Sequence, residues 1–199
     1  MLRSFGTVTG WCLAGVVALA LVGCSAGTPA ASAGSGSTVA SAPVGHNMAG
    51  PAQDVVVSRA ALDAKPAPWV LTTPESAVRS YLDWISYGYR IGDSGVTTPT
   101  MSAGQEVHVD SYIQLNLESG RLIDQTLISI TFGTPSIEGT HTLVPSKEKW
   151  TYRYVSIKEV GKTLAGPYSA SYDSTYTLVK SGKNWVVDSV AAQAVGQVK

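Results

Sequence analysis

The stretch KWTYRY, residues 149–154, alternates large aromatic side chains with polar ones, and this alternation decides the fold. Trp150, Tyr152 and Tyr154 fall on one side of an extended chain, because successive side chains of a strand point to opposite faces. A strand with one aromatic and one polar face is typical of an antiparallel sheet that is covered on one side. The pattern continues from about residue 140 to residue 158 and predicts a long strand.

Three other segments with a period of two predict the rest of the sheet. They cover residues 122–133, 168–180 and 185–190, and the turn residues at 180–184 join the last two as a hairpin. Pro145 predicts a bulge or an edge in the strand that contains it. The covered face is expected to carry Leu122, Ile128, Ile130 and Phe132 in the first segment, and Tyr168, Ala170, Tyr172, Tyr176 and Leu178 in the second.

Two helices are predicted before these strands. Thr73 can cap the first, with Pro74 in its first turn, and either Gly88 or Gly92 closes it. The second begins after Ser102, with Gln105 at the capping-box position, and ends at Gly120; residues 92–100 between them have loop chemistry. The predicted fold class is therefore α+β, with two N-terminal helices packed on a curved antiparallel sheet of about four strands. The expected apolar face of the first helix is Val78, Tyr81, Leu82, Ile85 and Tyr89.

Three motifs together resemble the nuclear-transport-factor-like cone fold, and in particular its IMS-type branch. They are W-x-Y-x-Y at 150–154, Y-x-x-x-Y-x-L at 172–178 and W-x-V at 185–187. That branch occurs at the end of plastid-division and cyanobacterial cell-division proteins. The resemblance implies a protein-interaction or ligand-cavity module, and the branch has no shared catalytic set. A division role is not implied, because the long helical and transmembrane parts of those proteins do not appear in this sequence.

The N-terminus has the layout of an export signal. Arg3 is followed by an apolar stretch of about 15 residues, which is shorter than the roughly 20 that a membrane-spanning helix needs. LVGC, residues 21–24, resembles the lipobox at which a bacterial lipoprotein signal is cut before its cysteine. This resemblance implies that Cys24 becomes the mature N-terminus and carries a thioether-linked diacylglycerol. The alternatives are a plain secretory signal, in which Cys24 is incidental, and a resident transmembrane helix.

The domain boundaries follow from composition. Residues 1–23 are the predicted signal peptide, and residues 24–68 are an Ala/Gly/Ser/Pro-rich tether that would hold the domain about 35–40 Å from the bilayer. Residues 69–199 form the folded domain. The two cysteines are Cys12, inside the signal, and Cys24, so the mature domain is expected to have no disulfide and no cysteine metal ligand.

Charge and motif content exclude several classes of function. Lys plus Arg and Asp plus Glu number 14 each, and removal of the signal takes away only Arg3, which leaves 13 against 14. A balanced charge without a basic block argues against nucleic acid as a partner and against electrostatic attachment to a membrane. The sequence contains no metal-binding spacing, and we expect no cofactor and no metal.

An enzyme of the isomerase or hydrolase type is the alternative function. Strict alternation from Leu122 would turn Asp124 to the covered face, where a carboxylate among apolar neighbours could act as a general base. Tyr152 or His108 would then assist it. The favoured interpretation is that the strand starts only at about Thr126 and that Asp124 stays in solvent. His46 lies in the tether, and His141 is expected in an exposed turn.

The leading hypothesis is a non-enzymatic lipoprotein on the outer side of a bacterial membrane. Its domain would bind an envelope protein or a small apolar ligand, with the membrane as a second partner through Cys24. Five aromatic residues could line a ligand pocket, although core filling is favoured for them: Tyr152, Tyr154, Tyr172, Tyr176 and Trp185. The opposite face of the sheet is the expected docking surface, with Lys149, Thr151, Arg153, Thr175 and Thr177.

Overall fold

The computed structural model describes residues 63–195. The predicted signal peptide, Cys24 and most of the predicted tether lie outside this range. The described part contains helix α2 (Pro74–Ile91), the short 3-10 helix η1 (Gly95–Thr100) and helix α3 (Ala103–Glu118). The segment predicted as a loop between the two long helices is thus partly a 3-10 helix.

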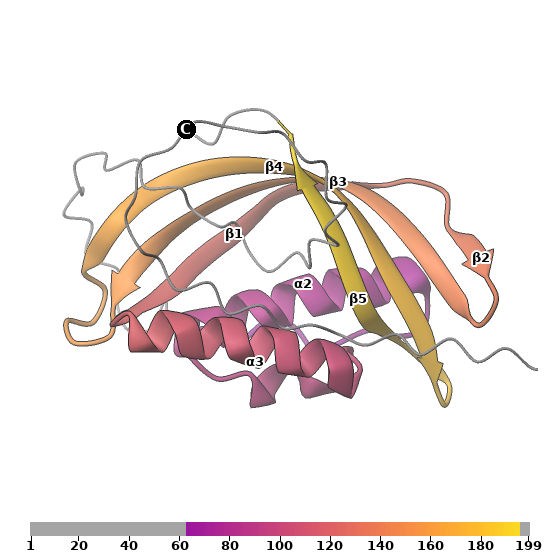
Figure 1. The fold of residues 1–199 in the computed structure, drawn as a ribbon, viewed down its shortest axis with the longest axis horizontal. Helices are drawn as coiled ribbons and strands as arrows, with labels where there is room; N and C mark the ends of the chain where they lie inside the picture. Colours follow the sequence, from indigo (N-terminus) through magenta and orange to yellow (C-terminus); the bar gives the residue numbers. More distant parts are fainter. Residues whose placement is uncertain (1–62, 196–199) are drawn as a thin grey trace, which may run out of the picture. The chain divides into compact units, whose positions relative to one another are not determined.

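A five-stranded antiparallel sheet follows the helices and arches over them, with α2 and α3 beneath its concave face (Figure 1). The hydrogen-bonded order is β1-β3-β4-β5, and β2 pairs with β3 beyond the end of β1. The α+β prediction is confirmed, with one strand more than the four expected. The strands are β1 (Arg121–Phe132), β2 (Ser136–Glu138), β3 (His141–Ser156), β4 (Thr163–Ser181) and β5 (Asn184–Ala194).

Helix α2 begins and ends where its sequence signals predict. The Thr73 hydroxyl accepts from the Ser76 N–H at 3.2 Å, and the Ser76 hydroxyl accepts from the Thr73 N–H at 3.1 Å, which forms a reciprocal capping box. Gly92 closes the helix at φ 74°, a left-handed conformation that glycine adopts without strain. All five predicted apolar-face residues are buried, so this helix supplies much of the core.

Helix α3 has half of its predicted capping box. The Ser102 hydroxyl accepts from the Gln105 N–H at 3.3 Å. The Gln105 side chain does not return to the cap; it turns inward and donates to the Tyr81 hydroxyl at 2.7 Å. This contact ties the N-terminus of α3 to the middle of α2.

A bulge in β1 makes the predicted face of this strand wrong in its first half. The register against β3 shifts between Leu127 and Ser129, so Ile128 is an extra residue and its side chain is 58% exposed. Before the bulge, Ile123 and Gln125 face the helices, whereas the prediction placed Leu122 there. After the bulge, Ile130 and Phe132 pack against the core as predicted.

The inner face of β3 forms the centre of the core. Trp150, Tyr152 and Tyr154 are all buried there, in the alternation that the sequence predicts. Pro145 lies where β1 has ended and the Gly133 N–H donates to its carbonyl at 2.8 Å. A residue without an N–H is tolerated at this break between two partner strands.

Ordered contacts begin before Trp69, at the end of the predicted tether. Trp84 of α2 donates its indole N–H to the Ala67 carbonyl at 3.1 Å, and its ring meets that of Trp69 edge to face at 5.1 Å. Arg90 donates to the Ala64 carbonyl at 3.0 Å. Residues 64–69 therefore run along α2.

Candidate functional site

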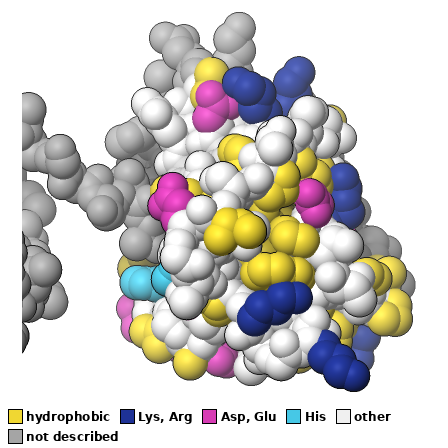
Figure 2. All heavy atoms as spheres, turned by 90° about the vertical axis from the view of Figure 1, so that its right-hand side faces the viewer, with side chains coloured by type: hydrophobic (Ala, Val, Ile, Leu, Met, Phe, Trp, Pro, Cys, Tyr) yellow, Lys and Arg dark blue, Asp and Glu magenta, His cyan; other side chains and the backbone are white. Residues whose placement is uncertain are grey.

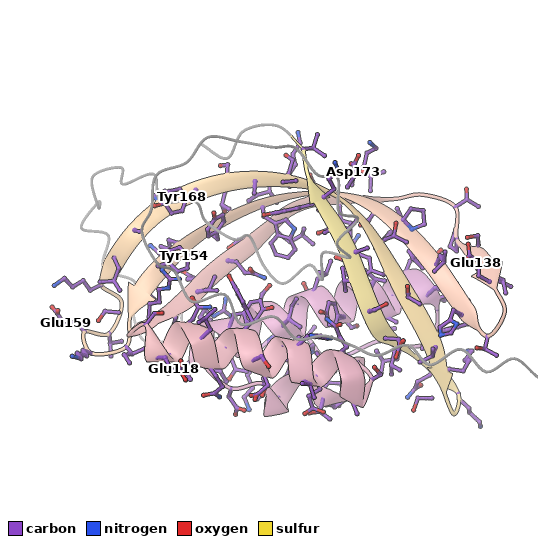
Figure 3. The ribbon with its side chains drawn as sticks, in the orientation of Figure 1. Glu118, Glu138, Tyr154, Glu159, Tyr168 and Asp173 are labelled. Atoms are coloured by element: carbon purple, nitrogen blue, oxygen red, sulfur yellow. The ribbon has the colours of Figure 1, made fainter. Side chains whose placement is uncertain are left out.

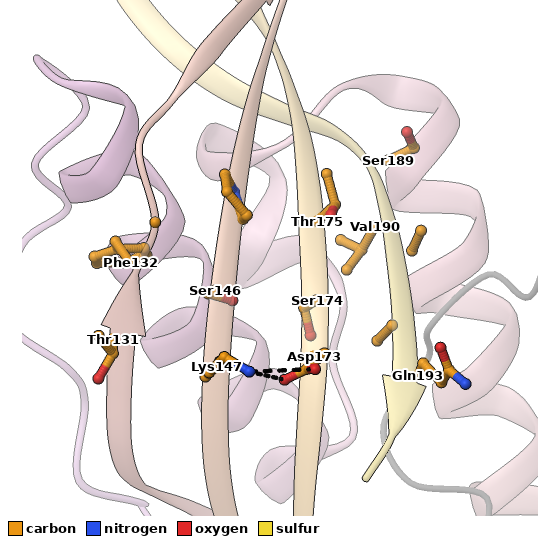
Figure 4. A pocket seen from close by; sticks show the side chains of 14 residues that line it. Thr131, Phe132, Ser146, Lys147, Asp173, Ser174, Thr175, Ser189, Val190 and Gln193 are labelled. Atoms are coloured by element: carbon orange, nitrogen blue, oxygen red, sulfur yellow. Dashed lines mark hydrogen bonds and ion pairs between the residues drawn. The ribbon is translucent and has the colours of Figure 1, made fainter.

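A groove of about 870 Å³ crosses the outer face of the sheet, on the side away from the helices (Figure 4). Its first row follows the strand register: Thr131 of β1 is opposite Lys147 of β3, which is opposite Asp173 of β4. Gln193 of β5 continues this row. Figure 3 shows Asp173 on the outer side of the arch, whereas Tyr154 lies beneath it.

The second row of the groove is made of smaller side chains. Pro145 of β3 is opposite Thr175 of β4, and Thr175 is opposite Ala191 of β5. Gly133 closes this row beside Pro145, where a Cβ atom would come within 2.9 Å of the proline ring. Glycine is therefore required for the close approach at this end. Short side chains on neighbouring strands leave the hollow that the longer Lys147 and Asp173 border.

The groove is electrically neutral. Its charged residues, Lys147 and Asp173, form an ion pair at 3.3 Å with side chains that are 77% and 53% exposed. Exposed pairs of this kind contribute little to stability and remain available to a ligand. The groove can offer hydroxyls, one amide and one charge pair. In the described part of the chain it has no buried acid or base that could transfer a proton.

The predicted docking residues share the outer face, but the groove takes in only Thr175 of them. Lys149 and Thr151 lie further along β3. Arg153 is engaged in an ion pair with Asp124, described below. The five residues thus lie on the outer face, and the groove lies further along the strands; their role in docking stays a prediction.

A second surface lies at the end of the sheet that carries β2. Hydrophobic side chains gather there, with Lys and Arg near them (Figure 2). Ile137 of β2 is 80% exposed, and the guanidinium of Arg79 lies 5.7 Å from the centre of the Phe132 ring. Exposed apolar residues of this kind are common at sites of protein interaction.

The structure places Asp124 on the outer face, and not on the covered face that strict alternation from Leu122 would give it. Its carboxylate accepts from Arg153 Nε at 2.9 Å and Nη2 at 2.7 Å, and Arg90 Nη1 lies at 3.9 Å. The cause is the bulge at Ile128, which reverses the faces between Asp124 and Phe132. The two arginines make this carboxylate a structural tie between β1, β3 and α2.

The three residues of the catalytic alternative do not meet. Asp124 is on the outer face of the sheet and the Tyr152 ring is in the core. His108 is exposed on α3. His141 is partly buried at the start of β3, opposite Glu138, and the predicted exposed turn is one residue earlier.

The aromatic residues proposed as pocket lining fill the interior. Tyr152, Tyr154 and Tyr176 are at most 6% exposed, while Tyr172 and Trp185 pack partly buried against the same core. The rings of Tyr152 and Tyr154 meet edge to face at 6.0 Å. Burial, followed by the neighbouring Tyr154, raises the pKa of the Tyr152 hydroxyl to about 12.

A buried carboxylate, Glu148, was missed by the sequence reasoning. Its Oε1 accepts from the Ser146 hydroxyl at 2.6 Å and from the Tyr176 hydroxyl at 2.7 Å, and its Oε2 accepts from the Trp150 indole at 2.8 Å. Burial, and then Glu148, raises the pKa of Tyr176 well above its ordinary value. The sequence did contain a signal for its burial: Glu148 lies two residues before Trp150, and alternation places both side chains on the inner face.

Two features are absent from the described residues. Between residues 63 and 195, no helix is both long and apolar enough to cross a bilayer. The same part of the chain contains no group of three His, Cys, Asp or Glu side chains that could hold a metal ion.

Comparisons with known proteins give similarities of structure. No protein-family model matches the sequence, and no curated protein matches it. The intermembrane-space region of the chloroplast protein ARC6 is similar over 65% of this chain and 100% of that chain, with 14% identity and a TM-score of 0.49. A domain of unknown function with a cystatin-like fold from Nostoc punctiforme is similar over 64% of this chain and 81% of that chain, with 11% identity and a TM-score of 0.39.

Proposed function

We propose that this chain is a membrane-anchored lipoprotein whose extracytoplasmic domain binds a protein partner without catalysing a reaction. The observation that carries the proposal is the groove on the outer face of the sheet, which combines a hollow of about 870 Å³ with mostly short, uncharged side chains beside the Lys147–Asp173 pair. Such a floor admits a polypeptide segment and offers it hydroxyl and amide groups.

A protein segment fits the groove better than a small apolar ligand. Small-molecule sites usually enclose most of the ligand's surface within apolar and aromatic walls. In this domain most aromatic side chains of the strands are packed into the core beneath the sheet, and the groove has Phe132 as its one aromatic lining residue and an exposed ion pair at its border. The exposed apolar surface around Ile137 also favours interaction with a protein.

The membrane anchor rests on the N-terminal sequence. An apolar stretch that ends in LVGC, followed by small polar residues, supports lipidation at Cys24 and a position outside the cytoplasm. Two or more acyl chains on one cysteine would hold the domain stably at a bilayer.

The geometry favours binding over the isomerase or hydrolase alternative. A cavity enzyme needs an acid or base in a pocket where burial adjusts its pKa. Asp124, the candidate base, is instead neutralised by Arg153 and Arg90 on the outer face.

Site-specific photocrosslinking in intact cells tests the proposal. A benzoylphenylalanine at Thr175, in the groove floor, is expected to form a discrete adduct with a second protein. The same probe at Lys183, an exposed turn residue outside the groove, is the control and should give none. Thr131→Arg, which fills the groove from β1, should reduce the Thr175 adduct. Equal adducts from both positions, or none from Thr175, would contradict a partner in the groove.

A further inference from the structure

The outer edge of β5 is covered over its first half. The Trp185 N–H donates to the Leu71 carbonyl at 2.8 Å, and the Ser102 N–H donates to the Val187 carbonyl at 2.9 Å. These contacts satisfy the outward main-chain groups of the strand as far as Val187. Beyond this point the register against β4 shifts, between Thr177 and Leu178.

The second half of this edge is uncovered in the part of the chain that the structure describes. The Val195 N–H donates to the Ser171 carbonyl at 2.8 Å, which shows which residues of β5 exchange hydrogen bonds with β4. Antiparallel strands alternate between pairs that exchange hydrogen bonds and pairs that do not. Val190, Ala192 and Ala194 therefore direct their N–H and C=O groups away from β4, and within residues 63–195 no main-chain partner meets them.

Beyond the bulge at residue 188, this edge lacks the other features that usually prevent strands from associating. Natural edge strands are protected by charged side chains, by proline or by a covering segment. Residues 189–195 read SVAAQAV, without charge or proline and with four small side chains. An exposed edge of this composition is expected to have a strand paired to it.

Helix α3 presents apolar residues on the same side of the molecule. Figure 1 shows α3 and β5 nearest the viewer, in front of α2. Val107 and Leu115 of α3 are 63% and 56% exposed, although the opposite side of this helix, with Val109 and Ile113, is already buried in the core. The helix is thus apolar on both sides. In Figure 1 it lies beneath the arch, while the second half of β5 rises to the top of the arch, so α3 does not border the uncovered edge.

We propose that a second copy of this chain pairs with β5, antiparallel and related by a two-fold axis. Ala192 would lie opposite its counterpart, and Val190 opposite the partner's Ala194. Three hydrogen-bonding residues on each strand would supply about six main-chain hydrogen bonds. A symmetric interface must be self-complementary, and an uncharged strand meets this condition because it places no like charges opposite each other.

The pairing would also extend the binding surface. Ser189, Ala191 and Gln193 of β5 line the outer-face groove, so two paired β5 strands bring two grooves together across the axis. The dimer does not depend on a groove partner, and its test is separate from the crosslinking test above.

Native mass spectrometry of the mature protein, extracted in detergent, tests the dimer. We expect a dimer for the native sequence. Ala192→Pro removes an outward N–H that β4 does not use, and should therefore leave the fold intact while it weakens dimerisation at least tenfold. Ala192→Thr retains the N–H and is the matched control, expected to stay dimeric.

Ala192→Lys provides a second test that removes no hydrogen-bonding group. It places two lysines opposite each other at the axis and should also give a monomer, with thermal unfolding as the check on folding. A monomeric native protein, or dimers that persist in both the Pro and the Lys variants, would overturn the proposal.

Discussion

The hydroxyl of Tyr152 is buried and has no hydrogen-bond partner among the described residues. A buried polar group without a partner costs about 1–3 kcal/mol. Tyr152→Phe removes the hydroxyl and keeps the ring contacts with Tyr154 and Tyr168. We expect this variant to raise the free energy of unfolding by about 1 kcal/mol at pH 7, measured with denaturant. A loss of stability would show that the hydroxyl is satisfied in solution.

The buried tyrosines also predict sensitivity to alkali. Burial raises the pKa of Tyr152 to about 12, and it raises the pKa values of Tyr81, Tyr172 and Tyr176 as well. The folded state then holds these protons more tightly than the unfolded chain, whose tyrosines titrate near pH 10. The contribution of these tyrosines to the free energy of unfolding should be fully present below pH 10 and should decline as the pH rises toward 12. Unfolding measured from pH 8 to 12 checks this, and Tyr152→Phe should decline less steeply.

Glu148 allows a test of whether its network needs a carboxylate. Gln can accept from the Trp150 indole and donate to the hydroxyls of Ser146 and Tyr176, since a hydroxyl also accepts. Glu148→Leu would instead leave all three groups without their acceptor. We expect the Leu variant to lose about 3 kcal/mol or more and the Gln variant to lose at least 1 kcal/mol less, by denaturant unfolding. Equal losses would contradict the hydrogen-bonding account.

Sequence reasoning at the scale of residues succeeded where alternation is unbroken. Along β3 it placed Trp150, Tyr152 and Tyr154 correctly on the inner face, and it could have placed Glu148 there too. Strict alternation alone misplaces Asp124, because one inserted residue reverses every side chain before it relative to those after it. The sequence around Ile128 has no glycine or proline to reveal the bulge.

At the scale of elements, the bulge in β1 makes a testable pair of isoleucines. Ile123 is 2% exposed, and Ile128, which the alternation placed in the core, is 58% exposed. Ile123→Ala should cost about 2–5 kcal/mol through lost burial and a cavity. Ile128→Ala should change stability by about 0.5 kcal/mol or less. Thermal or denaturant unfolding of the two variants distinguishes them, and similar losses would place Ile128 in the core.

Elements with local signals were predictable, and those defined by distant contacts were not. Helix α2 begins at the Thr73 cap and ends at the left-handed Gly92, and both are signals that the local sequence contains. Strand β2 has three residues and exists because β3 continues past the end of β1 and offers it an edge. The groove is likewise a product of register, since Thr131, Lys147 and Asp173 are far apart in sequence and meet only in the sheet.

At the scale of the whole molecule, contacts with α2 hold residues 64–69 against the folded domain. Trp84 reaches back to Ala67 and Trp69, so α2 fixes residues whose Ala- and Pro-rich composition predicts a flexible chain. Composition describes what a segment can bury by itself. Composition does not reveal that a later helix, here α2, offers the segment a surface to pack against.

Cys24 is the residue on which the proposed position at a membrane depends. If its sulfur carries the acyl chains, Cys24→Ser should move the protein from the membrane fraction to the soluble fraction, or leave it as an uncleaved precursor. Cys12 lies in the predicted signal and is the matched control, so Cys12→Ser should change neither fractionation nor mass of the mature protein. Fractionation with an intact-mass measurement separates these results. A mature Cys24→Ser protein that stays in the membrane fraction would show that something other than the lipid holds the domain there.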